Sequence, residues 1–325
     1  MRAAPWRGRC LCICVVKTFV RVAEVWVPSP DGTLLELGGG LFDAAPQFGV
    51  LSRTLCFGRA EGLPGRAWDE GRPVMLRRLE GPVFRRAQAA RAAGLTCAVA
   101  LPFFAGDALT SVVVLLCGDD EADIGAIELW HNDPRLTGDL RLAEGYFGAT
   151  APDLEALTRD GSLPRGAGAP GLAWQREAAV LIDNVATSPR FLRSQTAAHA
   201  GIVRALALPC SVRVNETWVL SLLSSATRPI ARRIESWLPS ELRTHLQRAH
   251  GHCEVRGCIP ANGRGPDCAG SPLEAAWLTG AAQVAGPDAV RRLHDGDAAC
   301  ASFTGLLALP VLSDGVVSEV VVLYF

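Results

Sequence analysis

Three arginines stand at matching places in the chain and could bind an anion. They are Arg86, Arg193 and Arg291, and each stands four residues after a proline. A glycine or serine precedes each proline, and such a pair is typical of the start of a helix. Phe84 and Phe191 precede the first two arginines by two residues. A guanidinium can hold an anionic group through two parallel hydrogen bonds. The alternative is that each arginine pairs with a nearby carboxylate of the protein and packs its stem on the helix.

Carboxylates that repeat with the same period are candidate partners of these arginines. Each stands two residues before a tryptophan in a strand-like run: Glu24 before Trp26, Glu128 before Trp130, and Glu235 before Trp237. Residues two apart on a strand point to the same face. Contact between these carboxylates and the arginines would therefore support the structural interpretation over the ligand-binding one.

Cysteines offer two further kinds of chemistry. His250, His252, Cys253, Cys258 and Cys268 lie together in a loop-like stretch, but without the paired C-x₂-C spacing of a zinc site. We predict no metal, with Cys253, Cys258 and Cys268 as weak candidates, and the sequence identifies no cofactor.

Catalytic patterns are missing as well. Cys97 and Cys210 lie near corresponding strands but at different offsets, five residues before and one after a repeated proline. No Ser/His/Asp or paired-carboxylate spacing stands out. We therefore predict that the protein is not an enzyme.

The elements that position these residues form a threefold repeat. The first tryptophans are 104 and 107 residues apart; the second ones, Trp68, Trp174 and Trp277, are 106 and 103 apart. Each unit then reaches an Ala-Leu-Pro segment that ends at Pro102, Pro209 or Pro310. Trp68 and Trp174 could be aromatic platforms for a ligand, although core packing is the simpler interpretation. The repeat predicts three units of about 100 residues.

The first unit shows the expected order of elements. Residues 22–28 and 33–37 flank a Ser-Pro-Asp-Gly turn and predict a β-hairpin. A glycine-rich bend enters a short helix at Trp68, and a brief strand follows. Residues 82–94 predict the best helix, and the last two strands follow, of which the valine-rich second one is expected to be central.

This order resembles the GAF domain family. The resemblance rests on Gly-Leu-Pro-Gly-Arg-Ala-Trp at residues 62–68, Gly-Ala-Pro-Gly-Leu-Ala-Trp at 168–174, and the repeated Ala-Leu-Pro. The third unit matches more loosely, through Ser-Pro-Leu-Glu-Ala-Ala-Trp at 271–277. The resemblance implies an α+β fold of tandem GAF/PAS-like units, each a central antiparallel sheet of five or six strands flanked by short helices. It also implies a small-molecule pocket under the helix that carries the repeated arginines.

We expect an N-terminal extension at 1–20 and units at 21–118, 119–226 and 227–325, the last divergent or truncated. The 325 residues carry a net charge of −1, which gives no bulk attraction for nucleic acid. No apolar run is long enough to span a membrane. Eleven cysteines, an odd number, suit free thiols in a cytoplasmic protein.

The sequence therefore predicts a non-enzymatic sensory or regulatory protein that binds a small ligand, an anionic one if the arginines bind it. Such a protein would signal to a partner or to an output domain, and could form a homodimer. The first alternative is a ligand-free scaffold for dimerisation or protein–protein interaction. The second is a cysteine-dependent methionine sulfoxide reductase. An open cavity with inward polar groups favours sensing, whereas a site filled by aromatic side chains favours scaffolding.

Overall fold

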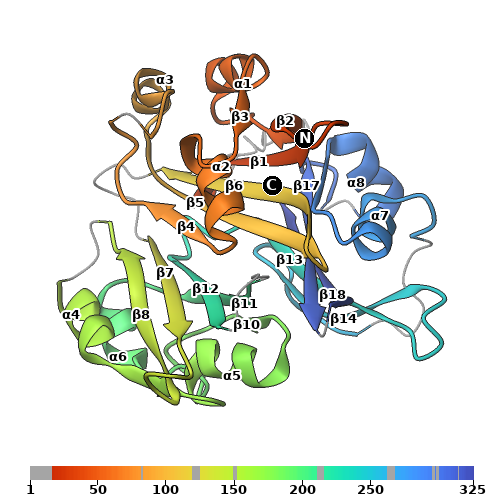
Figure 1. Ribbon diagram of the computed structural model, residues 1–325. Coiled ribbons are helices and arrows are strands. Elements are labelled where there is room, and N and C mark those ends of the chain that lie inside the picture. The colour runs from red at the N-terminus through yellow and green to blue at the C-terminus, as the bar shows by residue number, and fades with distance from the viewer. Residues whose placement is uncertain are drawn as a thin grey trace, which may run out of the picture.

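The computed structural model describes residues 17–81, 83–118, 125–148, 152–210, 216–261, 268–294, 297, 300–313 and 315–325. Most of the predicted N-terminal extension, residues 1–16, lies outside the described residues, and so does Pro82. Three six-stranded antiparallel sheets follow one another along the described chain, each flanked by short helices (Figure 1). This is the α+β architecture that the sequence predicted.

Unit 1 has the strand order β3-β2-β1-β6-β5-β4. Its strands are β1 (Val20–Pro28), β2 (Leu34–Leu41), β3 (Cys56–Gly58), β4 (Val74–Leu76), β5 (Leu95–Ala105) and β6 (Ala108–Gly118). Its helices are α1 (Pro46–Ser52), α2 (Gly62–Glu70) and α3 (Ala87–Ala92). The valine-rich β6 pairs with both β1 and β5, which confirms that it is a central strand.

Unit 2 repeats this order as β9-β8-β7-β12-β11-β10. Its strands are β7 (Gly125–Asn132), β8 (Asp139–Tyr146), β9 (Ser162–Pro164), β10 (Val180–Ile182), β11 (Arg204–Pro209) and β12 (Thr217–Ser224). Its helices are α4 (Pro152–Asp160), α5 (Gly168–Arg176) and α6 (Ser194–His199).

Unit 3 has the same sheet, β15-β14-β13-β18-β17-β16, but differs in its helices. Its strands are β13 (Arg233–Pro239), β14 (Leu246–Cys253), β15 (Gly257–Ile259), β16 (Gln283–Ala285), β17 (Leu306–Ser313) and β18 (Val316–Tyr324). Its helices are α7 (Pro272–Thr279) and α8 (Pro287–Leu293). Only residues 254–256 link β14 to β15, where units 1 and 2 insert a helix.

The prediction of a helix directly after each repeated proline is correct only in unit 3. There α8 begins at Pro287, whereas α3 begins at Ala87 and α6 at Ser194, five residues after Pro189. The residues before α3 and α6 bury Phe84 and Phe191 against the core, and this brings the chain in toward the sheet before the helix can start. The predicted ends are correct, since Gly94 and Gly201 have positive φ angles.

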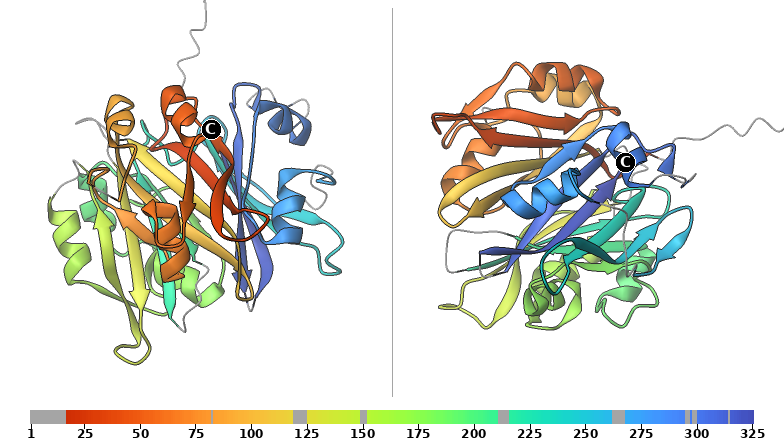
Figure 2. Two further views of the ribbon diagram at one scale, coloured as in Figure 1. Left: turned by 45° about the horizontal axis from the view of Figure 1, so that its top comes forward. Right: turned by 90° about the vertical axis from the view of Figure 1, so that its right-hand side faces the viewer.

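Each sheet has one face toward its own helices and the other toward a core shared by all three units. In β1, Ala23 and Val25 belong to the shared core, whereas Val22 and Trp26 pack under the helices. Leu129 and Leu309 join the shared core from the other sheets. Figure 1 shows α1 and α3 at the top, α4 and α6 at the lower left, and α7 and α8 at the right, around the three sheets; Figure 2 gives two further views.

The three Ala-Leu-Pro segments meet in this shared core. A cavity of about 20 Å³ is lined by three residues from each of β5, β11 and β17 and their ends, including Pro102, Pro209 and Pro310. The repeat therefore gives an approximate threefold arrangement within one chain. Because apolar burial is the main stabilising term in folding, the units stabilise one another through this core.

Polar contacts also join the units. The Thr110 hydroxyl donates to the carbonyl of Gly280 at 2.8 Å, which joins units 1 and 3. Glu319 accepts from the backbone N–H of Ala179 at 2.7 Å, which joins units 3 and 2, and burial raises the pKa of its carboxyl. None of the described helices is long and apolar enough to cross a membrane.

Candidate functional site

A fully buried carboxylate lies under the helices of unit 1. Glu24 is 0% exposed and accepts from the Trp26 indole Nε1 at 3.1 Å and from the Ser52 hydroxyl at 2.7 Å. The Arg86 guanidinium donates to both carboxylate oxygens, with Nη2 3.0 Å from Oε2. The charge of Glu24 is therefore balanced by one arginine, and both oxygens are hydrogen-bonded.

Aromatic rings enclose the Arg86 side chain, which is 5% exposed. Its guanidinium carbon lies 4.3 Å from the ring centroid of Phe48, on α1, and 5.4 Å from that of Phe84. These distances are within the range of cation–π contacts. Helix α1 thus closes the site from above, because it supplies both Phe48 and the Ser52 hydroxyl.

Unit 2 builds the same site. Arg193 reaches Glu128 with Nη1 at 2.6 Å from Oε1 and Nη2 at 2.9 Å from Oε2, and Trp130 Nε1 lies 3.0 Å from Oε2. Thr158, on α4, takes the place of Ser52 and accepts from Arg193. The structural interpretation of Arg86 and Arg193, a pair with the repeated carboxylate, is therefore confirmed. Their binding of an anion stays a prediction, and so does a binding role for Phe84 and Phe191.

Local geometry places these groups. A register shift before each first tryptophan interrupts the pairing of β1 with β2 and of β7 with β8. Glu24 and Trp26 share one face of β1, as predicted, and that face is the helix side. Arg86 and Arg193 are the N-cap residues of α3 and α6. An arginine at the entry of the helix points down at the sheet, so that it reaches the carboxylate.

The prediction that Arg291 occupies the same helix position is wrong. Since α8 begins at Pro287, Arg291 lies inside the helix, is 59% exposed and pairs with Asp288 on the same helix. Glu235, the buried carboxylate of unit 3, pairs with other arginines.

Two strand arginines replace the helix arginine around Glu235. Arg233 donates from Nε at 3.0 Å and Arg248 from Nη1 at 3.2 Å, both to Oε1. Trp237 Nε1 at 3.1 Å and the Tyr324 hydroxyl at 2.9 Å donate to Oε2. Burial alone would lower the pKa of Arg233, but Glu235 raises it above its usual value. Glu235 therefore faces two arginines where Glu24 faces one.

The strand pairing shows which positions changed. Arg248 stands opposite Trp237, where Leu37 and Leu142 stand opposite the matching tryptophans. Arg233 stands two residues before the carboxylate, where units 1 and 2 have Val22 and Ala126. Sequence reasoning missed both arginines, although an alignment of the three units on their Glu-x-Trp segments would have shown Arg233 at a position that is apolar in units 1 and 2. The position of Arg248 follows only from the strand register, because Leu142 is one residue further from its tryptophan than Leu37 and Arg248 are from theirs.

A cavity of about 570 Å³ lies beside these arginines. Its lining comes from the ends of β13 and β14, the link to β15, and α8: Arg233, Arg248, Arg256, Cys258, Ile259, Pro260, Arg292, Leu293, His294 and Asp297. In units 1 and 2 the link between the corresponding strands contains α1 or α4. The short link in unit 3 therefore leaves open a place that a helix covers in the other units.

The cavity has an excess of positive charge. Four arginines and one aspartate line it, and Glu235 lies buried beside Arg233 and Arg248. Asp297 pairs with Arg256 at 2.8 Å and with Arg233 at 3.1 Å. The Arg248 side chain is 10% exposed, and its buried Nε has no hydrogen-bond acceptor. Burial lowers the pKa of His294, so that its ring is neutral at pH 7.

The second tryptophans lie on corresponding helices. Trp68 is on α2 and Trp174 on α5, and both are half-buried against the helix-side cores of their units. The two environments match, as the repeat requires. Packing accounts for both residues, and their role as ligand platforms stays a prediction.

The described cysteines are free thiols, and most of them are buried. Within the described residues, no group of three or more His, Cys, Asp or Glu side chains could hold a metal ion. Of the weak candidates, Cys253 and Cys268 are buried and Cys258 is exposed. Burial raises the pKa of Cys210 and of Cys300 to about 12. Such thiols stay protonated at neutral pH and are poor nucleophiles.

Solved structures are similar to single units of this chain. A mutated NreA protein from Staphylococcus aureus, altered in its nitrate binding site, is 15% identical over 34% of this chain and 80% of its own, with a TM-score of 0.27. The GAF domain of A. aeolicus nlh2 is 19% identical over 31% of this chain and 58% of its own, with a TM-score of 0.25.

A free methionine-R-sulfoxide reductase from Neisseria meningitidis is 17% identical over 32% of this chain and 53% of its own, with a TM-score of 0.24. No protein-family model matches the sequence, and no curated protein is similar to it. Each of these solved structures covers about a third of the chain. The chain spans little more than half the length of two of these proteins.

Proposed function

We propose that this protein is a non-enzymatic regulatory protein in which unit 3 binds a small anion, while units 1 and 2 form its scaffold. The observation that carries the proposal is the open, arginine-lined cavity beside Glu235. It meets the condition for sensing, an open cavity with inward polar groups. The matching places in units 1 and 2 are covered by helices and contain one balanced ion pair each.

An anion in this cavity would find donors that the protein does not fully use. Arg248 has a buried N–H without an acceptor, and Arg292 on α8 has no ion pair within the described residues. A cavity walled by protein strengthens charge–charge attraction relative to open water. A planar or tetrahedral oxyanion suits guanidinium groups, because it can accept two parallel hydrogen bonds.

Ligand binding could reach a partner through α8. This helix lines the cavity with Arg292 and Leu293, is followed directly by His294, and also contacts β16 and β17. Strand β16 lies against β2 of unit 1. We propose that an anion which draws Arg292 inward shifts α8 and the seam between units 1 and 3, and that a partner or output domain responds. A ligand shifts a protein only by binding one state better than the other.

Calorimetric titration of the full chain with nitrate, phosphate, sulfate, acetate and citrate tests the proposal. We expect saturable binding of at least one anion. Arg248→Leu restores the residue type of units 1 and 2. It should lower the affinity for that anion about 10-fold or more, because a charge-assisted hydrogen bond contributes about 1.5–3 kcal/mol. Arg292→Ala should weaken it as well.

Arg291→Ala is the matched control, since it removes a neighbouring arginine that points away from the cavity and pairs with Asp288. Unchanged anion affinity in this variant supports the assignment of the anion to the cavity of unit 3. Equal losses in the Arg291 and Arg292 variants, or no saturable binding of any of the five anions, would contradict the proposal.

A second function, association, is favoured for units 1 and 2 by their closed sites and by the shared core. If the whole chain is a ligand-free scaffold, native mass spectrometry of the purified protein should show a bare monomer or homodimer. A co-purified small molecule of fixed mass supports sensing instead, and its loss in Arg248→Leu would assign it to unit 3.

A further inference from the structure

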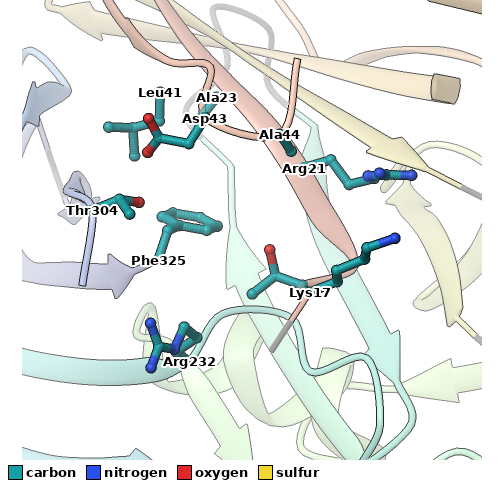
Figure 3. A pocket seen from close by; sticks show the side chains of 10 residues that line it. Lys17, Arg21, Ala23, Leu41, Asp43, Ala44, Arg232, Thr304 and Phe325 are labelled. Carbon is teal, nitrogen blue, oxygen red and sulfur yellow. The ribbon is translucent and has the colours of Figure 1, made fainter. Parts of the chain in front are cut away.

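A second cavity lies between units 1 and 3, on the opposite side of the sheet of unit 1 from Glu24. Its volume is about 440 Å³. The lining residues come from the start of β1, the end of β2 and the turn after it, and from unit 3: Lys17, Thr18, Arg21, Ala23, Leu41, Asp43, Ala44, Arg232, Thr304 and Phe325. Figure 3 shows the Phe325 ring in the middle of this group, with Arg232 on one side and Lys17 and Arg21 on another.

Positive charge exceeds negative charge in this lining by two. Lys17, Arg21 and Arg232 line the cavity together with a single acid, Asp43, which is solvent-exposed. No ion pair within the described residues involves any of the three cations. Elsewhere in the protein buried arginines such as Arg86 and Arg233 have carboxylate partners, so this group differs from the rule that the rest of the chain follows.

Arg232 is the deepest of the three cations, with 9% of its surface exposed. Its guanidinium donates to the backbone carbonyl of Ser302 at 2.7 Å and to the hydroxyl of Ser302 at 2.6 Å, and it stacks on Phe303 at 4.9 Å. These groups orient the guanidinium but do not neutralise it. Burial lowers the pKa of Arg232, and no carboxylate of the described residues pairs with its guanidinium to offset that desolvation. A ligand anion would offset it.

Apolar side chains form much of the remaining lining, beside Thr18 and Thr304. Ala23, Leu41 and Phe325 supply hydrocarbon and aromatic surface between the cations. Binding pockets for small organic molecules have this composition, a mainly apolar wall with a few polar groups that fix orientation. A bare inorganic ion would leave this wall in contact with water.

We propose that the seam between units 1 and 3 is a binding site for a carboxylate with an apolar chain or ring. The carboxylate pairs with Lys17 and Arg21, on the β1 side of the cavity, while the apolar body packs on Leu41 and Phe325. This site is separate from the anion cavity of unit 3 and goes beyond the proposed function. Its occupant would tie unit 1 to unit 3, because both units line the cavity.

Titration of the full chain with decanoate, with decanol as the uncharged comparison and inorganic phosphate as the comparison without an apolar body, tests the proposal. We expect one decanoate per chain to bind saturably, and at least 10-fold more tightly than decanol or phosphate. Arg21→Gln, which removes a cation, and Ala44→Trp, which fills the cavity from its exposed side, should each weaken decanoate about 10-fold or more.

Arg292→Gln is the control, because it alters only the cavity of unit 3 and should leave decanoate affinity unchanged. Equal binding of decanol, or unchanged affinity in both Arg21→Gln and Ala44→Trp, would overturn the proposal. A loss in Arg292→Gln alone would assign decanoate to unit 3 and would also overturn it. If nitrate and the other small anions fail to bind, this proposal still stands, because those titrations concern the cavity of unit 3.

The chain itself offers a readout that needs no variant. Lys17 is its only lysine, so amine-reactive labelling followed by mass spectrometry reports on one side chain of the site. Decanoate should slow labelling of Lys17 at least several-fold, whereas decanol should not. Labelling that decanoate leaves unchanged would contradict a carboxylate bound beside Lys17.

Discussion

Units 1 and 3 both bury a carboxylate under the helices of a six-stranded sheet, but they neutralise its charge differently. Unit 1 balances Glu24 with one arginine from the entry of α3 and covers the pair with α1. Unit 3 balances Glu235 with two arginines from its own strands and has no helix between β14 and β15. The first solution gives a closed core, and the second leaves a cavity with surplus positive charge.

The comparison shows that the tryptophan and the carboxylate are the fixed part of the unit, while the cation is interchangeable. Each first tryptophan donates to its carboxylate at 3.0–3.1 Å in all three units. The cation comes from whichever element can reach it. When it comes from the strands, the helices no longer have to close over the site, and a ligand can take the space.

The largest effect should follow from removing the only cation of a closed unit. Arg86→Met leaves Glu24 buried without a counter-ion, which typically costs about 3–5 kcal/mol. Arg248→Leu leaves Glu235 still paired with Arg233, so we expect a loss well below that. Urea unfolding of both variants measures the difference, and Glu24→Gln combined with Arg86→Met should recover part of the loss. Equal destabilisation by the two single substitutions would contradict the comparison.

A smaller difference should separate the tryptophans. Trp26→Phe removes one donor to Glu24, and a hydrogen bond to a charged group contributes about 1.5–3 kcal/mol. Trp237→Phe should cost less, because Tyr324 and two arginines still donate to Glu235. Thermal unfolding of the two variants, with the same ring lost in each, provides a matched pair. A larger loss in Trp237→Phe would show that unit 3 depends on its carboxylate as unit 1 does.

Anion affinity in unit 3 should rise modestly, by less than about 10-fold, as the pH falls from 7 to 5. Burial lowers the pKa of His294, so its ring is neutral at pH 7 and gains a proton as the pH falls through its lowered pKa. A bound anion attracts the protonated ring, so protonation and anion binding favour each other. The charged and titratable groups around it are Glu235, Tyr324, Arg233, Asp297 and Arg248.

Calorimetry at several pH values measures this trend, and His294→Gln should flatten it. A pH profile that is the same in the variant would assign the proton to another group. His294 lies 3.7 Å from Glu235, whereas in the described parts of units 1 and 2 no histidine pairs with Glu24 or Glu128, so the trend would also separate unit 3 from them.

The smallest effect on stability should come from substitution of Arg291, which the repeat predicted to match Arg86 but which pairs with Asp288 on the surface. Arg291→Ala removes an exposed pair with Asp288, and such surface pairs contribute about 0–1 kcal/mol. We expect unfolding midpoints close to those of the unaltered chain. A loss comparable to that of Arg86→Met would mean that Arg291 does have a structural role equivalent to that of Arg86.

Several features of the site were predictable because they depend on neighbours in the sequence. The shared face of Glu24 and Trp26 follows from their spacing of two on a strand, and the pairing of Arg86 and Arg193 with the repeated carboxylates follows from the common period. The first residues of α3 and α6 were not predictable from the prolines that precede them in the sequence, Pro82 and Pro189. Burial of Phe84 and Phe191 outweighed the preference of proline for the first turn of a helix.

The sequence by itself determined three copies of one sheet, with a tryptophan and a carboxylate anchored in each, because strand alternation and residue spacing act over short distances. Tertiary structure alone decided which arginines reach Glu235, that the sheets share a core, and that cavities open in unit 3 and between units 1 and 3. These outcomes depend on side chains that are far apart in the chain, such as Arg248 and Arg292 or Arg21 and Arg232, and only packing brings them together.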